Sequence, residues 1–411
     1  MKHTDIKTQV TIWNRNFICV IISNFMLNFA HFSVNPLVAS YAIHLGSSAL
    51  LMGLLTGLFF GVALSMRPFA GPVVTMFDNR KLLIMVFILG GFVNIGYALF
   101  HSIPFFIVFR FLHGVQYSIV GSLIMTLAGN NLPIGKMASG IGIYGLGGAI
   151  AMAIGPSIGI NLLEFGTNIR NESFGFTCIF LFAMTMLFLA IIPSSILLPD
   201  KKTKEDISST GAWYKNIVSL HAIPIGIIMF FVIIGWALYN LYIVEFAKEQ
   251  GIAGISSFYT LLALVMIITR PLSGWLIDRF GLSRILPPSL VLFAVSFFIV
   301  GFSNSIGTIL VAAVMAALGF GSSQPALFSM CVQSETPLKR SVASNTLYIG
   351  LDLGLFLGPI MGSIVYKMYN YSFMFKSAPI IVFIALISFF LTLPAYNRRR
   401  NVLEAMETEA R

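Results

Sequence analysis

The chain has 411 residues, of which 57% are hydrophobic and only 10% are charged, and its formal net charge is +10. Soluble domains carry about 25% charged residues, so the composition excludes a soluble globular protein. A run of about 20 apolar residues spans a bilayer as a helix, and twelve such runs occur here. We therefore expect an all-α membrane protein. The expected spans are residues 15–43, 49–74, 81–101, 104–129, 138–163, 174–198, 221–246, 254–277, 284–304, 306–331, 341–366 and 373–396.

The positions of the basic residues predict the topology. Most of the 25 Lys and Arg residues fall at the two ends of the chain and in alternate loops. Cytoplasmic loops carry an excess of these residues, so both termini are expected to be cytoplasmic. The positive charge is then a topology signal, and no nucleic-acid partner is expected. The expected location is a bacterial cytoplasmic membrane, crossed many times.

Polar side chains follow one stripe of the first span and one face of the fourth. The first set is expected to line a polar cavity, because amides that face lipid are costly; the alternative is hydrogen bonding between helices. In the second set, an arginine inside a span is a functional candidate by default, although it could also snorkel or hold neighbouring helices. The two sets are Asn24, Asn28, His31 and Asn35, and Arg110, His113 and Tyr117.

A short motif occurs twice at a separation of 203 residues. Arg67-Pro68 recurs as Arg270-Pro271, each followed by a glycine. The second copy continues into Asp278 and Arg279, where the first copy has Thr75 and Met76. Asp78 lies close enough to substitute. We interpret both copies as a conformational gate on the cytoplasmic side, formed by Arg67, Gly71, Asp78, Arg270, Gly274, Asp278, Arg279 and Arg284.

Small residues recur every four positions in the fifth and eleventh spans, again at an offset of 203. Such stripes let helices approach closely in a membrane, and the prolines loosen the backbone ladder near the middle of each span. We expect these two helices to form the packing interface that moves. The residues concerned are Gly147, Gly155, Pro156, Gly159, Gly350, Gly354, Gly358 and Pro359.

The repeat covers the whole chain and predicts two related halves. Parallel repeats of six spans place a binding site between them. The predicted units are a six-helix half at 1–198, a charged cytoplasmic linker at 199–220, a second six-helix half at 221–396 and a basic cytoplasmic tail at 397–411.

Polar residues of the second half add further candidates. Trp236, Tyr239 and Asn240 share a face that could line the cavity or belong to an aromatic belt at the membrane surface. Gln324 is polar enough for the cavity. Asp352 lies about eleven residues into its span, where a carboxyl group suits reversible protonation; a structural hydrogen bond is the alternative.

These features together resemble the major facilitator superfamily. The turn R-P-x-x-G-x-x-x-D-R, the halves and the central linker carry the resemblance over essentially the whole chain. Within that superfamily the chain looks like the drug:proton antiporter group, because Gly142, Gly155-Pro156 and Gly159 match its fifth-span signature and Arg110–Gly114 resembles its R-x-x-Q-G. His113 replaces the Gln. The resemblance implies a role in proton transfer for Arg110 and in antiport for Gly155-Pro156.

We expect a secondary transporter that works by alternating access and exports a small organic compound in exchange for protons. Asp352, Arg110 and His31 are the predicted proton-coupling residues. One alternative is proton-coupled or facilitated uptake of a small polar or anionic nutrient; another is a non-transporting sensor or scaffold. No enzymatic activity, cofactor or metal site is expected, and the chain is expected to be a monomer whose energy source is the proton gradient.

Overall fold

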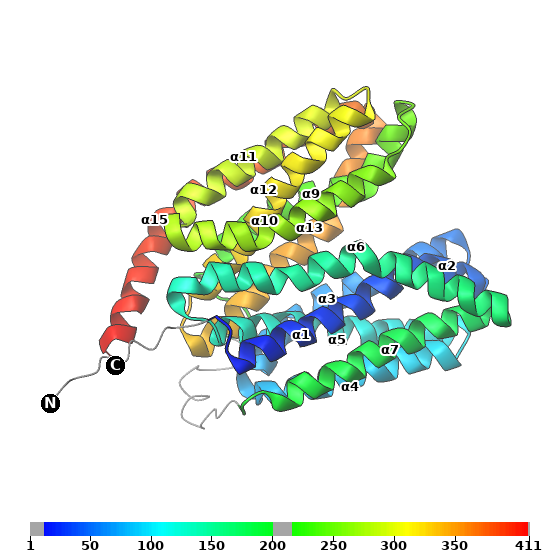
Figure 1. Ribbon diagram of the computed structural model, residues 1–411, viewed down its shortest axis with the longest axis horizontal. Helices are drawn as coiled ribbons and strands as arrows, with labels where there is room; N and C mark the ends of the chain where they lie inside the picture. Colours follow the sequence, from blue (N-terminus) through cyan, green and yellow to red (C-terminus); the bar gives the residue numbers. More distant parts are fainter. Residues whose placement is uncertain (1–11, 200–215, 410–411) are drawn as a thin grey trace.

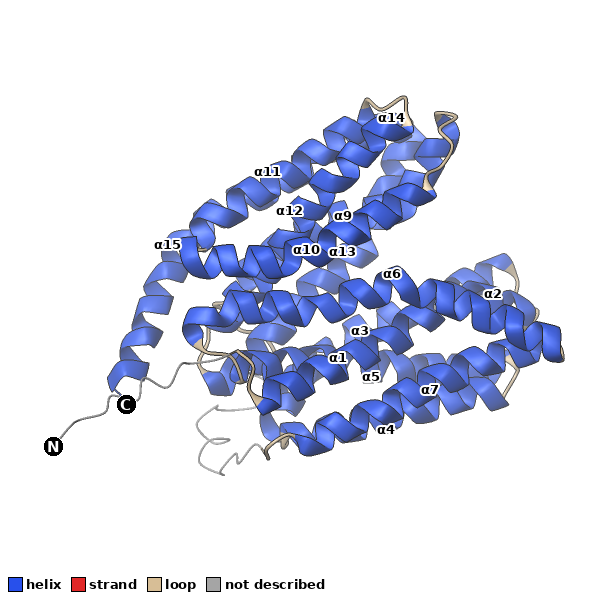
Figure 2. Cartoon of the chain, in the orientation of Figure 1, coloured by secondary structure: helices blue, strands red, loops and turns tan. Residues whose placement is uncertain are grey.

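The computed structural model describes residues 12–199 and 216–409. In these ranges all regular structure is helical (Figure 2). Twelve segments are long and apolar enough to cross a membrane, and each coincides with one of the predicted runs. The all-α membrane fold and its twelve spans are therefore confirmed.

The first six spans form one bundle, coloured blue to green in Figure 1. Its first span bends where Asn35 begins a short 3₁₀ turn and Pro36 interrupts the helical ladder. The helices are α1 (Arg15–Val34), α2 (Val38–His44), α3 (Ala49–Met76), α4 (Asn79–Leu99), α5 (Ile103–Asn130), α6 (Met137–Ile169) and α7 (Glu172–Ile196).

The last six spans form the second bundle, coloured green to red. Of the predicted linker, residues 200–215 lie outside the described part. The predicted tail is helical as far as Glu409, because the last helix continues through it without a break. The helices are α9 (Ile223–Glu249), α10 (Ser256–Phe280), α11 (Leu282–Gly301), α12 (Ile306–Gln333), α13 (Arg340–Met368), α14 (Tyr371–Ser377) and α15 (Pro379–Glu409).

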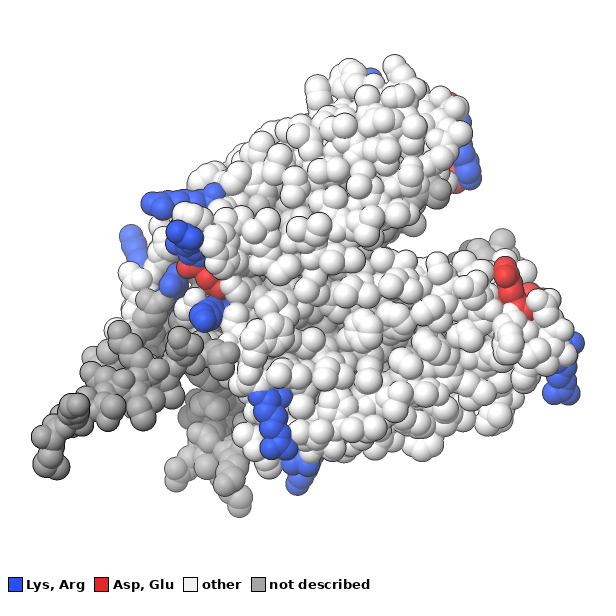
Figure 3. All heavy atoms as spheres, in the orientation of Figure 1, with Lys and Arg blue, Asp and Glu red and all other residues white. Residues whose placement is uncertain are grey.

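The two bundles meet chiefly where α3 packs on α13 and α6 packs on α10. They converge at the end of the molecule where α1 begins and α15 ends, which we call the terminal end, and they diverge toward the opposite, open end (Figure 1). The space-filling view shows a notch between the bundles at the open end (Figure 3). On this face Lys, Arg, Asp and Glu gather at the two ends, and the band between them is uncharged, as a membrane requires.

The predicted glycine stripes pack inside each half and not between the halves. Gly155 of α6 lies against Phe32 of α1, and Gly354 of α13 lies against Phe230 and Ile233 of α9. Both α6 and α13 do lie at the boundary between the bundles, but they present other faces to it. The stripes therefore hold each bundle together while the bundles meet through different residues.

Candidate functional site

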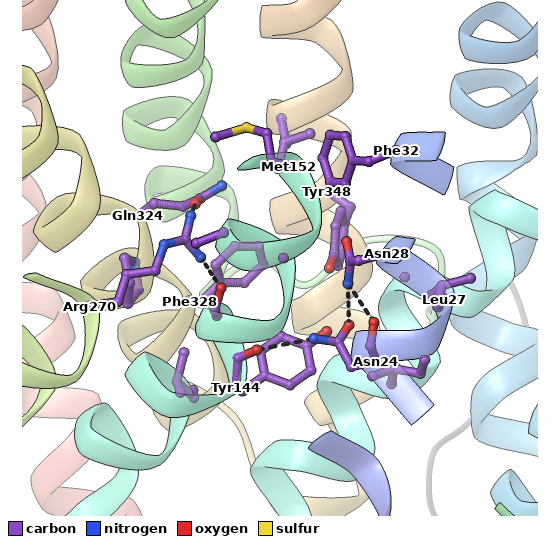
Figure 4. A pocket seen from close by; sticks show the side chains of 18 of the residues that line it. Asn24, Leu27, Asn28, Phe32, Tyr144, Met152, Arg270, Gln324, Phe328 and Tyr348 are labelled. Atoms are coloured by element: carbon purple, nitrogen blue, oxygen red, sulfur yellow. Dashed lines mark hydrogen bonds between the residues drawn. The ribbon is translucent and has the colours of Figure 1, made fainter. Parts of the chain in front are cut away.

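A cavity of about 210 Å³ lies between the two bundles. Helices α1, α5 and α6 of the first half and α9, α10, α12 and α13 of the second contribute to its wall (Figure 4). Five of the predicted cavity residues line it: Asn24, Asn28, Tyr117, Trp236 and Gln324.

The amides of α1 both line the cavity and join helices. Asn24 donates its side-chain N–H to the carbonyl of Tyr144 on α6 at 3.0 Å. Asn28 donates to the backbone and side-chain oxygens of Asn24 at 2.7 and 2.9 Å. The two readings of this stripe, cavity lining and interhelical hydrogen bonding, therefore hold together for this pair.

Aromatic rings form much of the remaining wall. Trp236 stacks on Phe320, with 4.0 Å between ring centroids and 3° between planes. Phe328, Tyr144 and Tyr348 also line the cavity. Stacked and offset aromatic faces of this kind bind planar apolar groups.

Arg270, which the sequence predicted for a cytoplasmic gate, lines the central cavity. The helix α10 continues past Pro271, so the side chain sits well inside the span. Its Nη1 donates to the carbonyl of Gly145 at 2.7 Å, and its Nη2 donates to Oε1 of Gln324 at 2.8 Å. The guanidinium is thus held between a helix of each half (Figure 4).

Five predicted cavity residues do not line this cavity, and three of them lie elsewhere in the two bundles. Asn35 lies in the bend after α1. Tyr239 is buried inside the second bundle, where its hydroxyl donates to Ser296 at 2.8 Å. Asn240 is exposed and bonds the carbonyl of Trp236. Trp236, Tyr239 and Asn240 share one broad face of their helix, so the sequence does not show which of them reaches the central cavity.

The histidines predicted for the cavity lie in a second, smaller one inside the first bundle. His31 and His113 line it together with Tyr117, which also lines the central cavity. His31 stacks on Tyr117 with 5.1 Å between ring centroids. Arg110 is buried nearby, donates to the carbonyl of Leu55 at 3.2 Å and lies over the ring of Phe59. Two of the three predicted proton-coupling residues, Arg110 and His31, therefore lie inside the first bundle, while Asp352 lies elsewhere.

Asp352 is instead paired with Arg67. The Nε of Arg67 on α3 donates to Oδ2 of Asp352 on α13 at 2.7 Å, and both side chains are almost fully buried. Arg67 also donates to the carbonyl of Ser118 at 2.7 Å and lies over the ring of Tyr348, which lines the cavity. Arg67, expected at a cytoplasmic gate, thus joins the two halves beside the cavity.

The predicted gate residue Asp278 does join the halves at the terminal end. Its two carboxylate oxygens accept the backbone N–H groups of Ala138 and Ser139, at 3.0 and 2.8 Å. These groups open helix α6, where the helix dipole favours a negative charge. Gly274, one turn earlier on α10, packs against the same residues, and a Cβ there would lie 2.5 Å from the carbonyl of Ala138.

The first copy of the motif makes a weaker version of this contact. Thr75 takes the place of the carboxylate, and its hydroxyl lies 2.8 Å from that of Ser341, at the start of α13. Gly71 packs against Asn216 and Asn345, as a gate residue should. Asp78, which was expected to substitute, accepts the N–H of Lys81 through Oδ1 and caps its own helix, α4.

Two of the predicted gate residues are exposed, and another arginine near the terminal end is buried. Arg279 and Arg284 are exposed, and Arg279 lies over the rings of Trp275 and Phe280 of its own helix. Arg340, which the sequence analysis did not single out, is buried and donates to the carbonyl of Gly129 at 3.0 Å, near the end of α5. A cation at a helix C-terminus is favourable, and no local pattern in the sequence reveals this partner.

Two six-helix bundles around a central cavity, closed at one end and open at the other, define a membrane transporter. A family model described as Major Facilitator Superfamily matches residues 20–222 and 225–409. The chain belongs to the Major Facilitator Superfamily and is a multi-pass protein of the cell membrane.

Curated relatives and solved structures extend over nearly the whole chain. The staphylopine export protein of Staphylococcus aureus is 21% identical over 92% of this chain and 96% of its own length. Multidrug resistance protein 2 of Bacillus subtilis is 23% identical over 88% of this chain and 92% of its own length. In structure, the transporter FucP in its outward conformation matches with a TM-score of 0.76 at 12% identity, covering 92% of this chain and 98% of FucP. The human organic anion transporter MFSD10 matches with a TM-score of 0.72 at 14% identity, over 91% and 98%.

Proposed function

We propose that this transporter exports a small organic compound in exchange for protons. The observation that carries the proposal is the buried Arg67–Asp352 pair, which joins α3 to α13 beside the cavity. The names of the two curated relatives, an export protein and a multidrug resistance protein, support the direction of transport. The terminal end is taken as cytoplasmic, in line with the distribution of basic residues.

In this mechanism the charged pair helps to hold the terminal end closed while the cavity faces outside. A proton that reaches Asp352 from outside neutralises the carboxylate and leaves Arg67 without its counter-charge, so the contact between α3 and α13 weakens. The terminal end then opens, the proton leaves to the cytoplasm, and substrate enters the cavity. Deprotonated Asp352 attracts Arg67 again, which returns the loaded transporter to the outward-facing state.

The test is dye movement in proteoliposomes under an imposed pH gradient, with fluorescein and ethidium as anionic and cationic probes. Export by antiport predicts accumulation of at least one dye when the lumen is acidic, whichever way the protein is inserted, because coupling is thermodynamic. Collapse of the gradient with nigericin should abolish accumulation. The Asp352→Asn variant should still exchange dye down its own gradient but should not accumulate it.

Glu245→Gln provides the matched control, because Glu245 is exposed and pairs with Lys248 on its own helix at 2.8 Å. That variant should accumulate dye as the native protein does. Accumulation driven by an acidic exterior would instead establish symport and hence uptake. Absence of pH-driven movement of either dye, or full accumulation by Asp352→Asn, would contradict the proposal.

A further inference from the structure

The charges around the central cavity are one-sided. Among the described residues that line it, Arg270 is the only one with a charged side chain. Asp352, a buried carboxylate of α13, does not line the cavity and is held by Arg67 at 2.7 Å. The positive charge of Arg270 therefore faces the cavity without a carboxylate to balance it.

The guanidinium is held in a fixed orientation yet retains unused hydrogen-bonding capacity. A guanidinium has five N–H donors, and Arg270 uses one on Gly145 and one on Gln324. Its Nε–H is buried and has no acceptor within the described part of the chain. Planar guanidinium groups bind carboxylates through two parallel N–H···O bonds. An oxyanion would satisfy the donors that the protein leaves open.

The aromatic part of the cavity wall could bind an apolar, planar group. Gln324 lies next to Arg270 on one side of the cavity, while Asn24 and Asn28 lie on the other (Figure 4). The stacked pair of Trp236 and Phe320 also lines the cavity. The volume of about 210 Å³ is below the 300–1,000 Å³ of pockets for drug-sized ligands. The cavity therefore fits a small compound, or one end of a longer one.

We propose that the substrates are small organic anions, with the carboxylate or an equivalent oxyanion on Arg270 and an aromatic or planar apolar group against Trp236 and Phe320. This inference rests on the proposed function, since it names the substrate class of the same cavity. It assigns Arg270 to substrate binding and Gln324 to positioning the guanidinium. Cations should be excluded, because a cation would face an unbalanced like charge at close range.

Equilibrium binding of three matched probes, benzoate, benzyl alcohol and benzylammonium, tests this assignment. The readout is the fluorescence of Trp236 in purified full-length protein whose other tryptophans, Trp13, Trp213 and Trp275, are replaced by phenylalanine. Benzoate should bind at least about tenfold more tightly than benzyl alcohol, and benzylammonium should bind most weakly. No proton gradient is involved, so this result is independent of whether export is proton-driven.

Two variants remove the unbalanced positive charge of the cavity in different ways. Arg270→Gln deletes it, and Gln324→Glu keeps the arginine but places a carboxylate on its Nη2. Both should weaken benzoate binding about tenfold or more and leave benzyl alcohol binding unchanged, a selective loss that misfolding would not produce. Arg398→Gln removes an exposed charge from α15 and should leave all three affinities unchanged.

The inference is overturned by any of three results: no benzoate binding up to about 10 mM, near the weak end of measurable affinities, tighter binding of benzylammonium than of benzoate, or benzoate binding that survives both variants. In that case pH-driven export of ethidium would still uphold the proposed antiport with a different substrate class. Conversely, selective benzoate binding without pH-driven flux would keep the substrate class and remove the proton coupling.

Discussion

The Arg67–Asp352 pair is buried but incompletely satisfied. Oδ1 of Asp352 and Nη2 of Arg67 are both buried, and neither has a hydrogen-bond partner among the described residues. A buried ion pair stabilises a protein only when its remaining donors and acceptors are also satisfied. This pair is therefore poorly suited to a purely structural role and well suited to one that forms and breaks.

Removing either partner alone should destabilise the protein more than removing both. Asp352→Asn leaves the buried charge of Arg67 uncompensated, and Arg67→Gln does the same to Asp352; each should cost about 3–5 kcal/mol. The double variant buries no charge and should recover most of the lost stability. Thermal unfolding of the four proteins in detergent gives the coupling, and additive losses would argue against a direct interaction.

Sequence reasoning identified one member of this pair and missed the other. Asp352 stands out because an acid deep in an apolar run needs an explanation. Arg67 was assigned to a turn motif, and its partner lies 285 residues away in the other half. The repeat gave no help, because the counterpart of Asp352 in the first half is Ala149. Pairings of this kind depend on how two bundles dock, which no local pattern encodes.

At the scale of helices, the two halves close the terminal end with unequal contacts. Asp278 places a carboxylate on the first N–H groups of α6, where both the hydrogen bonds and the helix dipole favour it. Thr75 places only a hydroxyl near the start of α13. Hydrogen bonds to charged groups contribute about 1.5–3 kcal/mol, compared with about 1 kcal/mol for neutral ones. The α6–α10 contact is therefore the stronger of the two.

Restoring the carboxylate in the first half should strengthen the closed terminal end. Thr75→Asp would place a carboxylate at the start of α13, as Asp278 does at the start of α6, and should favour the closed state by about 1 kcal/mol. The expected result is slower dye exchange. Thr75→Val, which removes the hydroxyl contact, should have the opposite effect; equal behaviour of the two variants would refute the comparison.

The elements themselves were largely predictable, and their contacts were not. Apolar runs of span length gave all twelve membrane helices, and the offset of 203 gave the two halves. The glycine stripes correctly predicted close helix packing, but they could not show which neighbour each helix faces. Gly354, for example, packs on α9 of its own half, against Phe230 and Ile233. The spacing of the small residues shows which face of a helix packs closely, but it does not show which neighbouring helix that face contacts.

For the whole molecule, alternating access requires that the closure at the terminal end be reversible. The hydroxyls of Thr75 and Ser341 are 2.8 Å apart across the two halves, so a disulfide of about 2.05 Å fits there with little movement. The Thr75→Cys/Ser341→Cys protein, with Cys19, Cys178 and Cys331 replaced by alanine, should lose dye transport on oxidation and regain it on reduction.

Each single-cysteine protein serves as the control and should transport under both conditions. Trp236 fluorescence should still report ligand binding in the oxidised protein, because the open end remains accessible. Transport that continues with the disulfide formed would show that the terminal end need not open, and would contradict alternating access through this contact.

The contact made by Asp278 is stronger than the one made by Thr75, and this difference suggests which helices separate first when the terminal end opens. The contact that the proposed mechanism releases by protonation, Arg67–Asp352, lies on the same α3–α13 side as the weaker hydroxyl contact. On the other side, α6 and α10 remain joined by Asp278 and by the close backbone approach at Gly274. The two bundles should therefore separate first along α3 and α13. The bundles would then rotate about the α6–α10 edge as a hinge, so that the entrance at the terminal end widens from one side.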